Sequence, residues 1–512
     1  MNILYSLRRA QQFHGSKVAS YREEGSITWN EVAERAGGVA AHLLDLGIGK
    51  GDRLATWMLN SHEYLELYFA TAIAGIVIVP LNTRWHLDDV AFALADSSAV
   101  ALVVDDKFVA SVEKLPAVRT VIHSGTSSCP AGIIPYSASG TRHCFAEPHE
   151  EDLAGLFYTS GTVGGPKGVM LTHRNLWANA LHTLLTVGTD LEVWLHSAPM
   201  FHLADLGVLY ALTCMGGAQA YLPSFDAGSF MQAVEKYRVT HTVLVPTMLL
   251  MLLNHPDFGK YDLSSLQRLA YGASPMPVPL MEEAMRRMPN VQFRQGYGMT
   301  ETSPLLTFLE HEDHFGLAVT SAGKPVLGVE LRVVDEFDRD VPVGESGEII
   351  ARGANVMKGY WNQPKMTAEV LRDGWMHTGD IGRFDENGFV YVLDRKKDMI
   401  KPGAENVYCP EVESTIASHP AVLETAVIGV PDPKWGETIR AVVALRSGTT
   451  LGEAELIEWC RDRMTHFKCP TSVVFVDVLP KSGTGKVQKN VLRERYGISS
   501  HSGKTLTPTS PS

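Results

Sequence analysis

Residues 156–168 read LFYTSGTVGGPKG, an apolar run that passes into a loop of hydroxyls and glycines and ends beside a lysine. The apolar run is typical of a buried strand. Glycines let backbone N–H groups approach phosphate oxygens, hydroxyls add donors, and Lys167 adds a positive charge. We therefore expect a phosphate-binding loop with contacts from Thr159, Ser160, Gly161, Thr162, Gly164 and Lys167.

This loop is not a P-loop. The pattern GxxxxGK[ST] fails because Pro166 precedes Lys167 and Gly168 follows it. The stretch GTGK at residues 483–486 fails as well, because Val487 follows it. Taken alone, residues 156–168 leave open a glycine-rich turn with incidental hydroxyls.

The composition excludes few classes of protein. The 512 residues carry 45 Lys and Arg against 57 Asp and Glu, a net charge of −12, which disfavours a nucleic-acid binder. The length suggests two to four domains. The six cysteines are scattered without metal-ligand spacing, and neither a signal peptide nor a transmembrane segment is evident. We expect a cytoplasmic protein with reduced thiols.

Helical and strand patterns alternate along most of the chain, which predicts an α/β fold with mostly parallel, buried strands. Thr28 and Glu31 have capping-box spacing before one helix, and Thr172 can cap another. The apolar stretch 67–81 is too short to span a membrane and is interpreted as a buried helix followed by a buried strand. Strands are expected at 101–104, 242–245 and 331–334.

The chain is expected to divide into a large N-terminal body and a small C-terminal lobe. Short strands and glycine-rich turns begin at about Gly323 and indicate a β-rich subdomain over residues 323–394. An α+β pattern over residues 395–498 indicates the lobe, and residues 499–512 form a polar tail expected to be disordered.

Three further clusters have the chemistry of a nucleotide site. In GYGMTE, Tyr297 could stack on a base, Thr300 could contact a phosphate oxygen, and Glu301 could ligate Mg²⁺. In HTGD, Asp380 could hold ribose hydroxyls. In PKSGTGKVQK, Lys486 could reach a reacting carboxylate or phosphate. Each cluster alone is more simply a loop, but together they supply base, ribose, phosphate, metal and cation contacts.

With these motifs in order, the sequence resembles the adenylate-forming superfamily, and most of all its fatty-acyl and related acid–CoA ligases. The resemblance spans roughly residues 10–497 and rests on TSGTVGGPKG, YGMTE, HTGD, DRKKDMIKPGAENVYCPEVE and PKSGTGKVQK. It implies the adenylate-forming fold: a large AMP-binding domain of mixed sheets packed with helices, residues 1–394, and a mobile lobe.

The resemblance also implies a two-step reaction. A carboxylic acid attacks the α-phosphate of ATP, giving acyl-AMP and pyrophosphate. The lobe then rotates, and the thiol of coenzyme A attacks the acyl-AMP, releasing AMP and the thioester. The implied ligands are ATP, Mg²⁺, coenzyme A and a carboxylic acid whose identity the sequence does not reveal.

Carried over by position, the resemblance implies a role for each matching residue. The phosphate loop would bind the β- and γ-phosphates, Thr300 the α-phosphate and Glu301 the Mg²⁺ ion. Lys486 would be the adenylation lysine, and Asp394 the hinge. Adenine would lie between Tyr297 and Gly272, Ala273 and Ser274, and the ribose would contact Asp380 and Arg395. In this assignment Lys486, Thr300 and Glu301 are catalytic.

The remaining assignments concern the thiol and the acid. Residues 401–410 would line the pantetheine path, with CoA contacts from Gly403, Ala404, Glu405 and Asn406. The acyl pocket would include His202, Asp205, Gly272 and Gly296. Asp205, three residues after His202, could orient its imidazole, although such a pair could equally serve only structure.

Two departures from the family pattern leave alternatives open. Val163 stands where the family usually has threonine, and Gly403-Ala-Glu-Asn406 replaces Gly-Gly-Glu-Asn after Lys401 and Pro402. We interpret both as tolerated variation. The alternatives are an enzyme with unbalanced half-reactions, which forms the thioester mainly from preformed acyl-AMP, or one that loads a carrier protein. A luciferase-type oxygenase is less favoured, and a homodimer is left open.

Overall fold

The computed structural model describes residues 1–140, 147–159, 166–403, 405–481 and 486–497. The described residues divide into two compact units. The large unit comprises Met1–Thr378 and Arg383–Tyr391, and the small unit comprises residues 379–382, 392–481 and 486–497 except residue 404. The sequence places the break slightly later, after Asp394.

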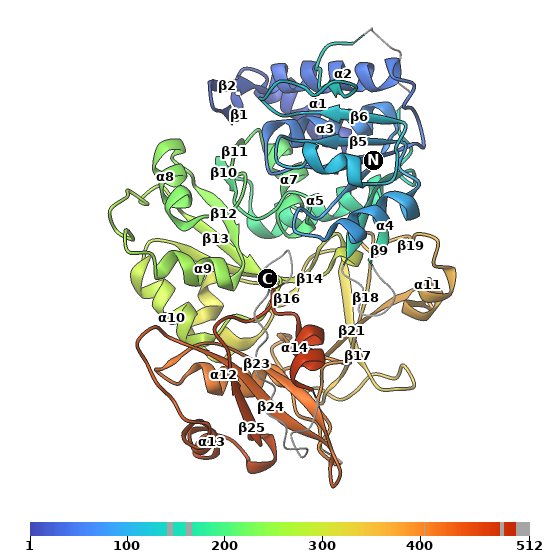
Figure 1. The fold of residues 1–512 in the computed structure, drawn as a ribbon. Coiled ribbons are helices and arrows are strands. Elements are labelled where there is room, and N and C mark those ends of the chain that lie inside the picture. The colour runs from blue at the N-terminus through green and yellow to red at the C-terminus, as the bar shows by residue number, and fades with distance from the viewer. Residues whose placement is uncertain (141–146, 160–165, 404, 482–485, 498–512) are drawn as a thin grey trace. The chain divides into compact units, whose positions relative to one another are not determined.

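Two sheets form the framework of the large unit (Figure 1). In the described chain, the first has the order β16-β15-β14-β13-β12-β10-β11-β1-β2. Its strands are β1 (Val18–Arg22), β2 (Gly25–Thr28), β10 (Val193–His196), β11 (Ala218–Tyr221), β12 (His241–Leu244), β13 (Arg268–Gly272), β14 (Gln292–Gly298), β15 (Leu305–Leu309) and β16 (Lys324–Pro325).

The second sheet has the order β19-β9-β8-β4-β3-β5-β6-β7. Its strands are β3 (Arg53–Trp57), β4 (Val77–Pro80), β5 (Ala101–Val104), β6 (Thr120–His123), β7 (Ile134–Pro135), β8 (Leu153–Thr159), β9 (Lys167–Thr172) and β19 (Gly359–Tyr360). The central strands β3, β4, β5 and β8 pair in parallel, as expected for an α/β fold.

Helices cover these sheets, and Figure 1 shows α8, α9 and α10 beside β12 and β13. The apolar faces of these three helices share a core with Leu244, Leu269 and Phe293. The helices of the large unit are α1 (Leu4–His14), α2 (Trp29–Asp45), α3 (His62–Ala74), α4 (Leu87–Ser97), α5 (His173–Val187), α6 (Leu203–Leu206), α7 (Leu209–Met215), α8 (Ala227–Tyr237), α9 (Pro246–Leu253), α10 (Val278–Arg287) and α11 (Pro364–Val370).

Local sequence signals explain several of these elements. Thr28 and Glu31 form the expected capping box at the start of α2, and Thr172 caps α5 together with Asn175. The apolar stretch 67–81 contributes most of α3 and all of β4, with Gly75 in a left-handed conformation between them. The predicted helix caps and the predicted helix and strand in residues 67–81 are confirmed.

A third sheet contains the short strands expected after Gly323. It has the order β17-β18-β21-β20, with β22 paired to β21. Its strands are β17 (Val329–Val334), β18 (Gly347–Gly353), β20 (Leu371–Arg372), β21 (Trp375–Phe384) and β22 (Val390–Arg395).

The small unit has its own sheet and core. The order β23-β24-β25 joins β23 (Val422–Asp432), β24 (Gly436–Leu445) and β25 (Ser472–Phe475). Helices α12 (Cys409–Ala417) and α13 (Glu453–Arg461) pack on this sheet through Val412, Ile416, Leu456 and Cys460, and α14 (Lys489–Tyr496) contributes Leu492 to a second cluster. The middle strand, β24, was not predicted from the sequence.

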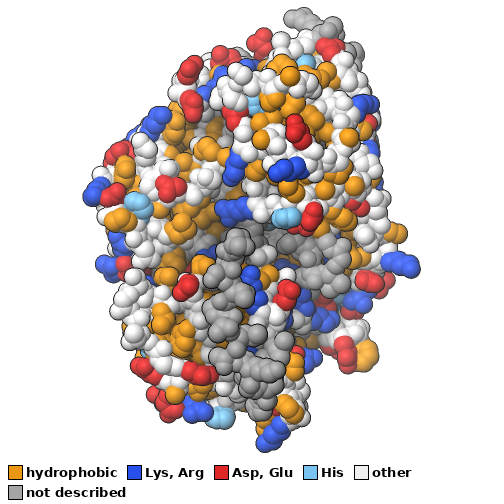
Figure 2. All heavy atoms as spheres, in the orientation of Figure 1, with side chains coloured by type: hydrophobic (Ala, Val, Ile, Leu, Met, Phe, Trp, Pro, Cys, Tyr) orange, Lys and Arg blue, Asp and Glu red, His pale blue; other side chains and the backbone are white. Residues whose placement is uncertain are grey.

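In the part of the chain that the structure describes, no helix has the length and apolar character needed to cross a membrane. Acidic and basic side chains are interspersed on the face shown in Figure 2, among the coloured residues.

Candidate active site

The phosphate loop is carried by the hairpin of β8 and β9. Thr159 and Lys167 are paired across this hairpin at the end that carries the loop, so the two ends of the loop are fixed against each other. Ser160, Gly161, Thr162, Gly164 and the departure at Val163 lie outside the described residues. The structure therefore defines the two strands that flank the loop and the positions of Thr159 and Lys167 at its ends.

The segment carrying Thr300 and Glu301 follows β14 and forms a short 3-10 turn, Thr300–Thr302. Both side chains are buried. Asn355 holds the segment, because its Nδ2 donates to the backbone oxygens of Thr302 at 2.8 Å and Leu305 at 2.9 Å. A buried amide with two backbone acceptors is a rigid support for the turn.

Tyr360 connects this segment to the phosphate hairpin. Its hydroxyl donates to Glu301 Oε1 at 2.7 Å, and its ring centroid lies 5.5 Å from Lys167 Nζ. Backbone hydrogen bonds connect the residues around Tyr360 to the same two segments: Met357 N–H donates to Glu301 O at 2.8 Å, and Trp361 N–H donates to Gly168 O at 2.7 Å. The predicted phosphate lysine and the predicted metal carboxylate therefore belong to one network.

The carboxylate of Glu301 is suited to coordinate Mg²⁺. Within the described residues, Oε1 accepts the Tyr360 hydrogen bond, whereas Oε2 accepts none. Mg²⁺ prefers carboxylate and phosphate oxygens and is usually held by one or two carboxylates together with substrate phosphates. A buried carboxylate with one oxygen fixed and the other available meets this requirement.

The predicted adenine positions lie at the carboxyl ends of two neighbouring parallel strands. Gly272 is opposite Gly296 in the pairing of β13 with β14, and Tyr297 is the next residue along β14. A Cβ on Gly272 would lie 2.2 Å from the Gly296 carbonyl oxygen, and Ala273 adopts a left-handed φ of 66°. Gly272 therefore lets the backbones of β13 and β14 approach closely. This packing requires a glycine at position 272 whether or not the residue borders an acyl pocket.

His202 and Asp205 do not form the suggested pair. His202 is the N-cap of α6, and its Nδ1 accepts the Ala204 backbone N–H at 3.1 Å. Because His202 precedes the helix, helical spacing does not bring Asp205 to its ring. Asp205 is instead fully buried and lies beside His196, with Oδ2 2.5 Å from Nδ1. This geometry places Asp205 in the core beneath the turn.

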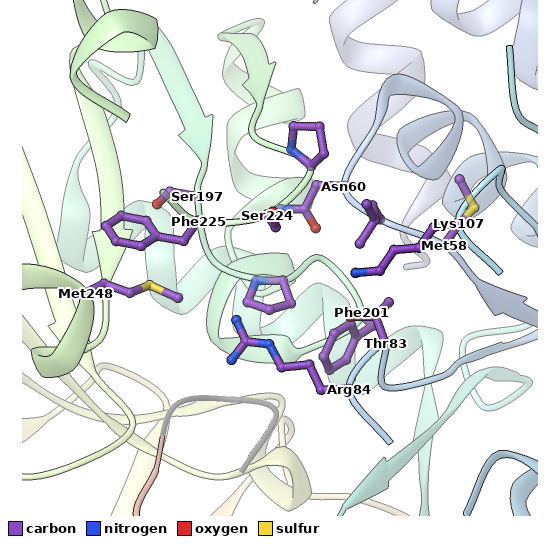
Figure 3. Close-up of a pocket in the computed structure, with 13 residues that line it drawn as sticks. Met58, Asn60, Thr83, Arg84, Lys107, Ser197, Phe201, Ser224, Phe225 and Met248 are labelled. Carbon is purple, nitrogen blue, oxygen red and sulfur yellow. The ribbon is translucent and has the colours of Figure 1, made fainter. Parts of the chain in front are cut away.

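A pocket opens where strand ends of both main sheets meet (Figure 3). Its walls follow β3, β4 and β5 in one sheet and β10, β11 and β12 in the other, all at their carboxyl ends. Ligands of α/β proteins bind at such edges. The residues labelled in Figure 3 are Met58, Asn60, Thr83, Arg84, Lys107, Ser197, Phe201, Ser224, Phe225 and Met248.

Two cations belong to this pocket, Arg84 and Lys107, and Figure 3 shows both side chains directed into it. Both are exposed to solvent, and neither forms an ion pair with any residue that the structure describes. Arg84 and Lys107 were not predicted from the sequence, because isolated basic residues in separate loops carry no motif. Such a pocket is suited to an anionic ligand.

The ribose residues lie together in the small unit. Arg395 Nε is 2.6 Å from Asp380 Oδ1, and Asp380 is almost fully buried. Lys396 N–H also donates to the Gly379 carbonyl at 2.9 Å. The structure thus brings together the two side chains that the sequence assigned to one sugar.

The predicted hinge residue is anchored by backbone donors. Asp394 accepts from its neighbour Arg395 N–H at 2.7 Å and from Cys409 N–H at 2.7 Å. Burial raises the pKa of the Asp394 carboxyl above its ordinary value. Burial also raises the pKa of the Cys409 thiol, so this cysteine is not an activated nucleophile.

The predicted CoA loop packs on the turn between β23 and β24. Gly403 has a left-handed φ of 67°, and its N–H donates to the Trp435 carbonyl at 2.8 Å. Glu405 and Asn406 are exposed, whereas Ala404 lies outside the described residues. Lys486 immediately precedes Val487, which pairs with Lys481 in an isolated bridge.

Comparison with known proteins assigns the chain to a family. The AMP-binding enzyme family matches residues 7–361, and the AMP-binding enzyme C-terminal domain matches residues 411–486. The chain belongs to the AMP-binding enzyme family. The predicted membership of the adenylate-forming superfamily is therefore confirmed, as is the predicted fold class.

Two curated relatives of this AMP-binding enzyme are CoA ligases. A feruloyl-CoA synthase of Amycolatopsis sp is 41% identical over 503 residues, covering 96% of this chain and 98% of that protein. A 2-succinylbenzoate–CoA ligase of Bacillus mycoides is 34% identical over 473 residues, covering 92% and 94%.

A solved structure has the same fold. The o-succinylbenzoate CoA synthetase of Bacillus subtilis, in complex with its acyl-adenylate intermediate, superposes with a TM-score of 0.83 at 30% identity, covering 96% of this chain and 97% of that one. A second structure of that synthetase is in complex with ATP and magnesium ion.

Proposed function

We propose that this chain joins an aromatic carboxylic acid, of the hydroxycinnamic class, to coenzyme A. The general reaction follows from homology: the chain is an ATP-dependent, AMP-forming acid–CoA ligase that works through an acyl-AMP and uses Mg²⁺ and coenzyme A. The predicted enzyme class and cofactors are confirmed. The relatives do not favour carrier-protein loading or unbalanced half-reactions.

The acid class is supported by the relatives. Ferulate and 2-succinylbenzoate, the acids named for these two ligases, both contain a benzene ring. The feruloyl-CoA synthase aligns along nearly the whole chain, so the walls of the acyl pocket have counterparts in it. A phenylpropenoic acid such as ferulate is therefore the first substrate to test.

The observation that supports nucleotide activation is the network of Lys167, Tyr360 and Glu301. It includes a cation at the loop end of the β8–β9 hairpin and, through Tyr360, a carboxylate oxygen available to a ligand. We assign Lys167, Thr159 and residues 160–164 to the β- and γ-phosphates, Thr300 to the α-phosphate, and Glu301 to the metal. When bound, Mg²⁺ supplies charge neutralisation for the phosphates.

The roles of the residues around adenine, the acid and the ribose, and those of Lys486 and Asp394, are also proposals. Tyr297 with Gly272, Ala273 and Ser274 would border adenine, and His202 with Gly296 would border the acid. Asp380 would accept hydrogen bonds from ribose hydroxyls, with Arg395 holding its carboxylate. Lys486 would stabilise the charge that develops as the acid attacks the α-phosphate, and Asp394 would be the hinge.

We further propose that Arg84 and Lys107 bind the phosphates of coenzyme A. Their pocket lies at the carboxyl ends of strands from both main sheets, and it includes Phe201, the neighbour of His202. Coenzyme A is strongly anionic, so it can be bound by two cations that are not paired to carboxylates. Gly403, Ala404, Glu405 and Asn406 stay proposed coenzyme A contacts, as the resemblance implies.

The proposal is tested by a panel of acids. Purified protein is incubated with ATP, Mg²⁺ and coenzyme A, and pyrophosphate release and thiol consumption are measured for ferulate, 4-coumarate, benzoate, 2-succinylbenzoate, acetate and palmitate. Ferulate or 4-coumarate should give the highest kcat/KM. A preference for acetate or palmitate would refute the acid class while leaving the CoA ligase assignment intact.

Two predictions from the sequence are not tested by these observations. A homodimer stays a prediction, which sedimentation equilibrium would decide. A cytoplasmic location also stays a prediction, which fractionation of the source cells would decide.

A further inference from the structure

Tyr360 occupies a position fixed by the phosphate hairpin itself. It is part of β19, where it pairs with Val169 of β9, two residues after Lys167. The preceding backbone is also fixed, because Lys358 N–H donates to the Met170 carbonyl at 3.0 Å. Tyr360 is 7% exposed, so its ring has little freedom. Any side chain that Tyr360 holds is thereby set relative to the phosphate loop.

Glu301 needs such a support. It belongs to a short 3-10 turn, where a long carboxylate side chain has several accessible rotamers. The Tyr360 hydroxyl donates to Oε1 at 2.7 Å and leaves Oε2 as the oxygen available to a ligand. Hydrogen bonds to ionised groups are stronger than neutral ones, and they fix geometry as well as contributing energy. Partners that orient metal ligands affect metal affinity about 10–100-fold.

The ring of Tyr360 adds a second connection. Lys167 Nζ lies 5.5 Å from the ring centroid, within the range of a cation–π contact. One tyrosine therefore contacts the lysine assigned to the β- and γ-phosphates through its face, and the carboxylate assigned to the metal through its hydroxyl. Mg²⁺ is usually held by one or two carboxylates together with substrate phosphates, so Lys167 and Glu301 would have to keep a fixed separation to hold a nucleotide with its metal.

We propose that Tyr360 is a positioning residue that orients Glu301 toward the divalent cation of the bound nucleotide and sets its separation from Lys167. The inference rests on the proposed role of Glu301. It predicts that the hydroxyl of Tyr360 contributes to metal affinity, whereas its ring contributes to packing and to the Lys167 contact.

The test is Tyr360→Phe, which keeps the ring and removes the hydroxyl. Its matched control is Tyr136→Phe, because Tyr136 donates a similar hydrogen bond, 2.8 Å, to the buried Glu66 elsewhere in the large unit. Mn²⁺ binding in the presence of a non-hydrolysable ATP analogue is followed by electron paramagnetic resonance. The Mg²⁺ concentration for half-maximal ATP–pyrophosphate exchange is measured in parallel.

Tyr360→Phe should weaken Mn²⁺ binding about tenfold and raise the half-maximal Mg²⁺ concentration to a similar extent. Exchange at saturating Mg²⁺ should stay within about threefold of the parent enzyme, and Tyr136→Phe should match the parent in both assays. Unchanged Mn²⁺ binding in Tyr360→Phe, or an equal loss in Tyr136→Phe, would overturn the proposal.

A double-mutant cycle separates positioning from a general loss of structure. In a Glu301→Gln background, Tyr360→Phe should cause no further loss of Mn²⁺ binding, whereas additive losses would overturn the proposal. The Mn²⁺ assay does not depend on any acid substrate. Absence of exchange with every acid would therefore refute the proposed function, while the role of Tyr360 would still be measured.

Discussion

Arg395 and Asp380 form a close ion pair within the small unit, with Nε 2.6 Å from Oδ1. Asp380 is almost fully buried and Arg395 is partly exposed. A buried carboxylate held by a guanidinium keeps its other oxygen in a fixed direction. This is the requirement for accepting hydrogen bonds from two neighbouring ribose hydroxyls.

Asp380→Asn should therefore weaken nucleotide binding. The amide removes the negative charge, leaves Arg395 without its counter-ion and replaces one acceptor by a donor. We expect KM for ATP to rise about 10–100-fold, measured by ATP–pyrophosphate exchange, with AMP affinity by calorimetry as a second measurement.

The control for Asp380 is Glu330→Gln. Glu330 forms a 2.6 Å ion pair with Arg352, but both are exposed, and such pairs contribute little. This control should keep the parent KM for ATP. An unchanged AMP affinity in Asp380→Asn would contradict the ribose assignment.

Arg84→Ala and Lys107→Ala should impair the thiol step alone. Each removes one cation from the pocket of Figure 3, so KM for coenzyme A should rise about tenfold per substitution. ATP–pyrophosphate exchange should not change, because coenzyme A takes no part in it.

Pantetheine provides a sharp control for these two variants. It carries the thiol but lacks the phosphates, so the variants and the parent enzyme should use it equally well. Lys260→Ala, at an exposed lysine of the large unit, should not change KM for coenzyme A. A loss of the pantetheine reaction equal to the loss with coenzyme A would show that the cations do not bind phosphate.

Buried histidines should make the folded protein sensitive to mild acid. Burial lowers the pKa of His173 to about 4 and that of His62 to about 3, the latter aided by Arg22 and Arg35. Burial, with Arg268, lowers the pKa of His241 to about 4. Below the ordinary value of about 6.5, the unfolded chain therefore binds protons that the folded chain does not.

The free energy of unfolding should therefore fall as pH drops from 6.5 toward 4. Each such group contributes at most about 1.4 kcal/mol per pH unit. Urea unfolding between pH 7 and 5 measures the slope, and His241→Asn should reduce it. A free energy of unfolding that is constant across this range would contradict the neutral, buried state of these rings.

Local signals in the sequence predicted much of the fold. Thr28, Glu31 and Thr172 begin helices because a side-chain cap needs only residues three positions apart. The strand expected at 101–104 coincides with β5, Ala101–Val104. The missed strand β24, Gly436–Leu445, has no clear alternation, because it lies between two neighbours and is buried over most of its length.

The site could be predicted only where a motif marks it. Four of the predicted residues belong to motifs: Lys167, Glu301, Asp380 and Arg395. In the structure, Tyr360 contacts both Lys167 and Glu301, and Asp380 forms an ion pair with Arg395. Tyr360 itself was missed, because its position comes from pairing with Val169 of β9 and its hydrogen bond reaches Glu301 across 59 residues of sequence. Arg84 and Lys107 were missed because only the meeting of separate strand ends makes them neighbours.

The opposite error is a contact that was suggested by the sequence and that the structure does not show, between His202 and Asp205. Spacing by three residues predicts a shared face only inside a helix, and His202 caps α6 from outside it. The buried partner of Asp205, His196, comes from the preceding strand and carries no sequence signal.

Two chemical steps, linked by an acyl-AMP, occur in this one chain, and Lys486 is proposed to act only in the first. The most direct measurement compares ATP–pyrophosphate exchange with CoA-dependent consumption of synthetic acyl-AMP, in the parent enzyme, in Lys486→Ala and in the control Lys481→Ala. Lys481 forms an ion pair with Glu424 and is the bridge partner of Val487, the residue that follows Lys486. The parent and the control should carry out both reactions, and Lys486→Ala should lose at least about a hundredfold in exchange while retaining thioester formation. Equal loss of both reactions in Lys486→Ala, or a parent enzyme that consumes acyl-AMP without exchange, would contradict the account.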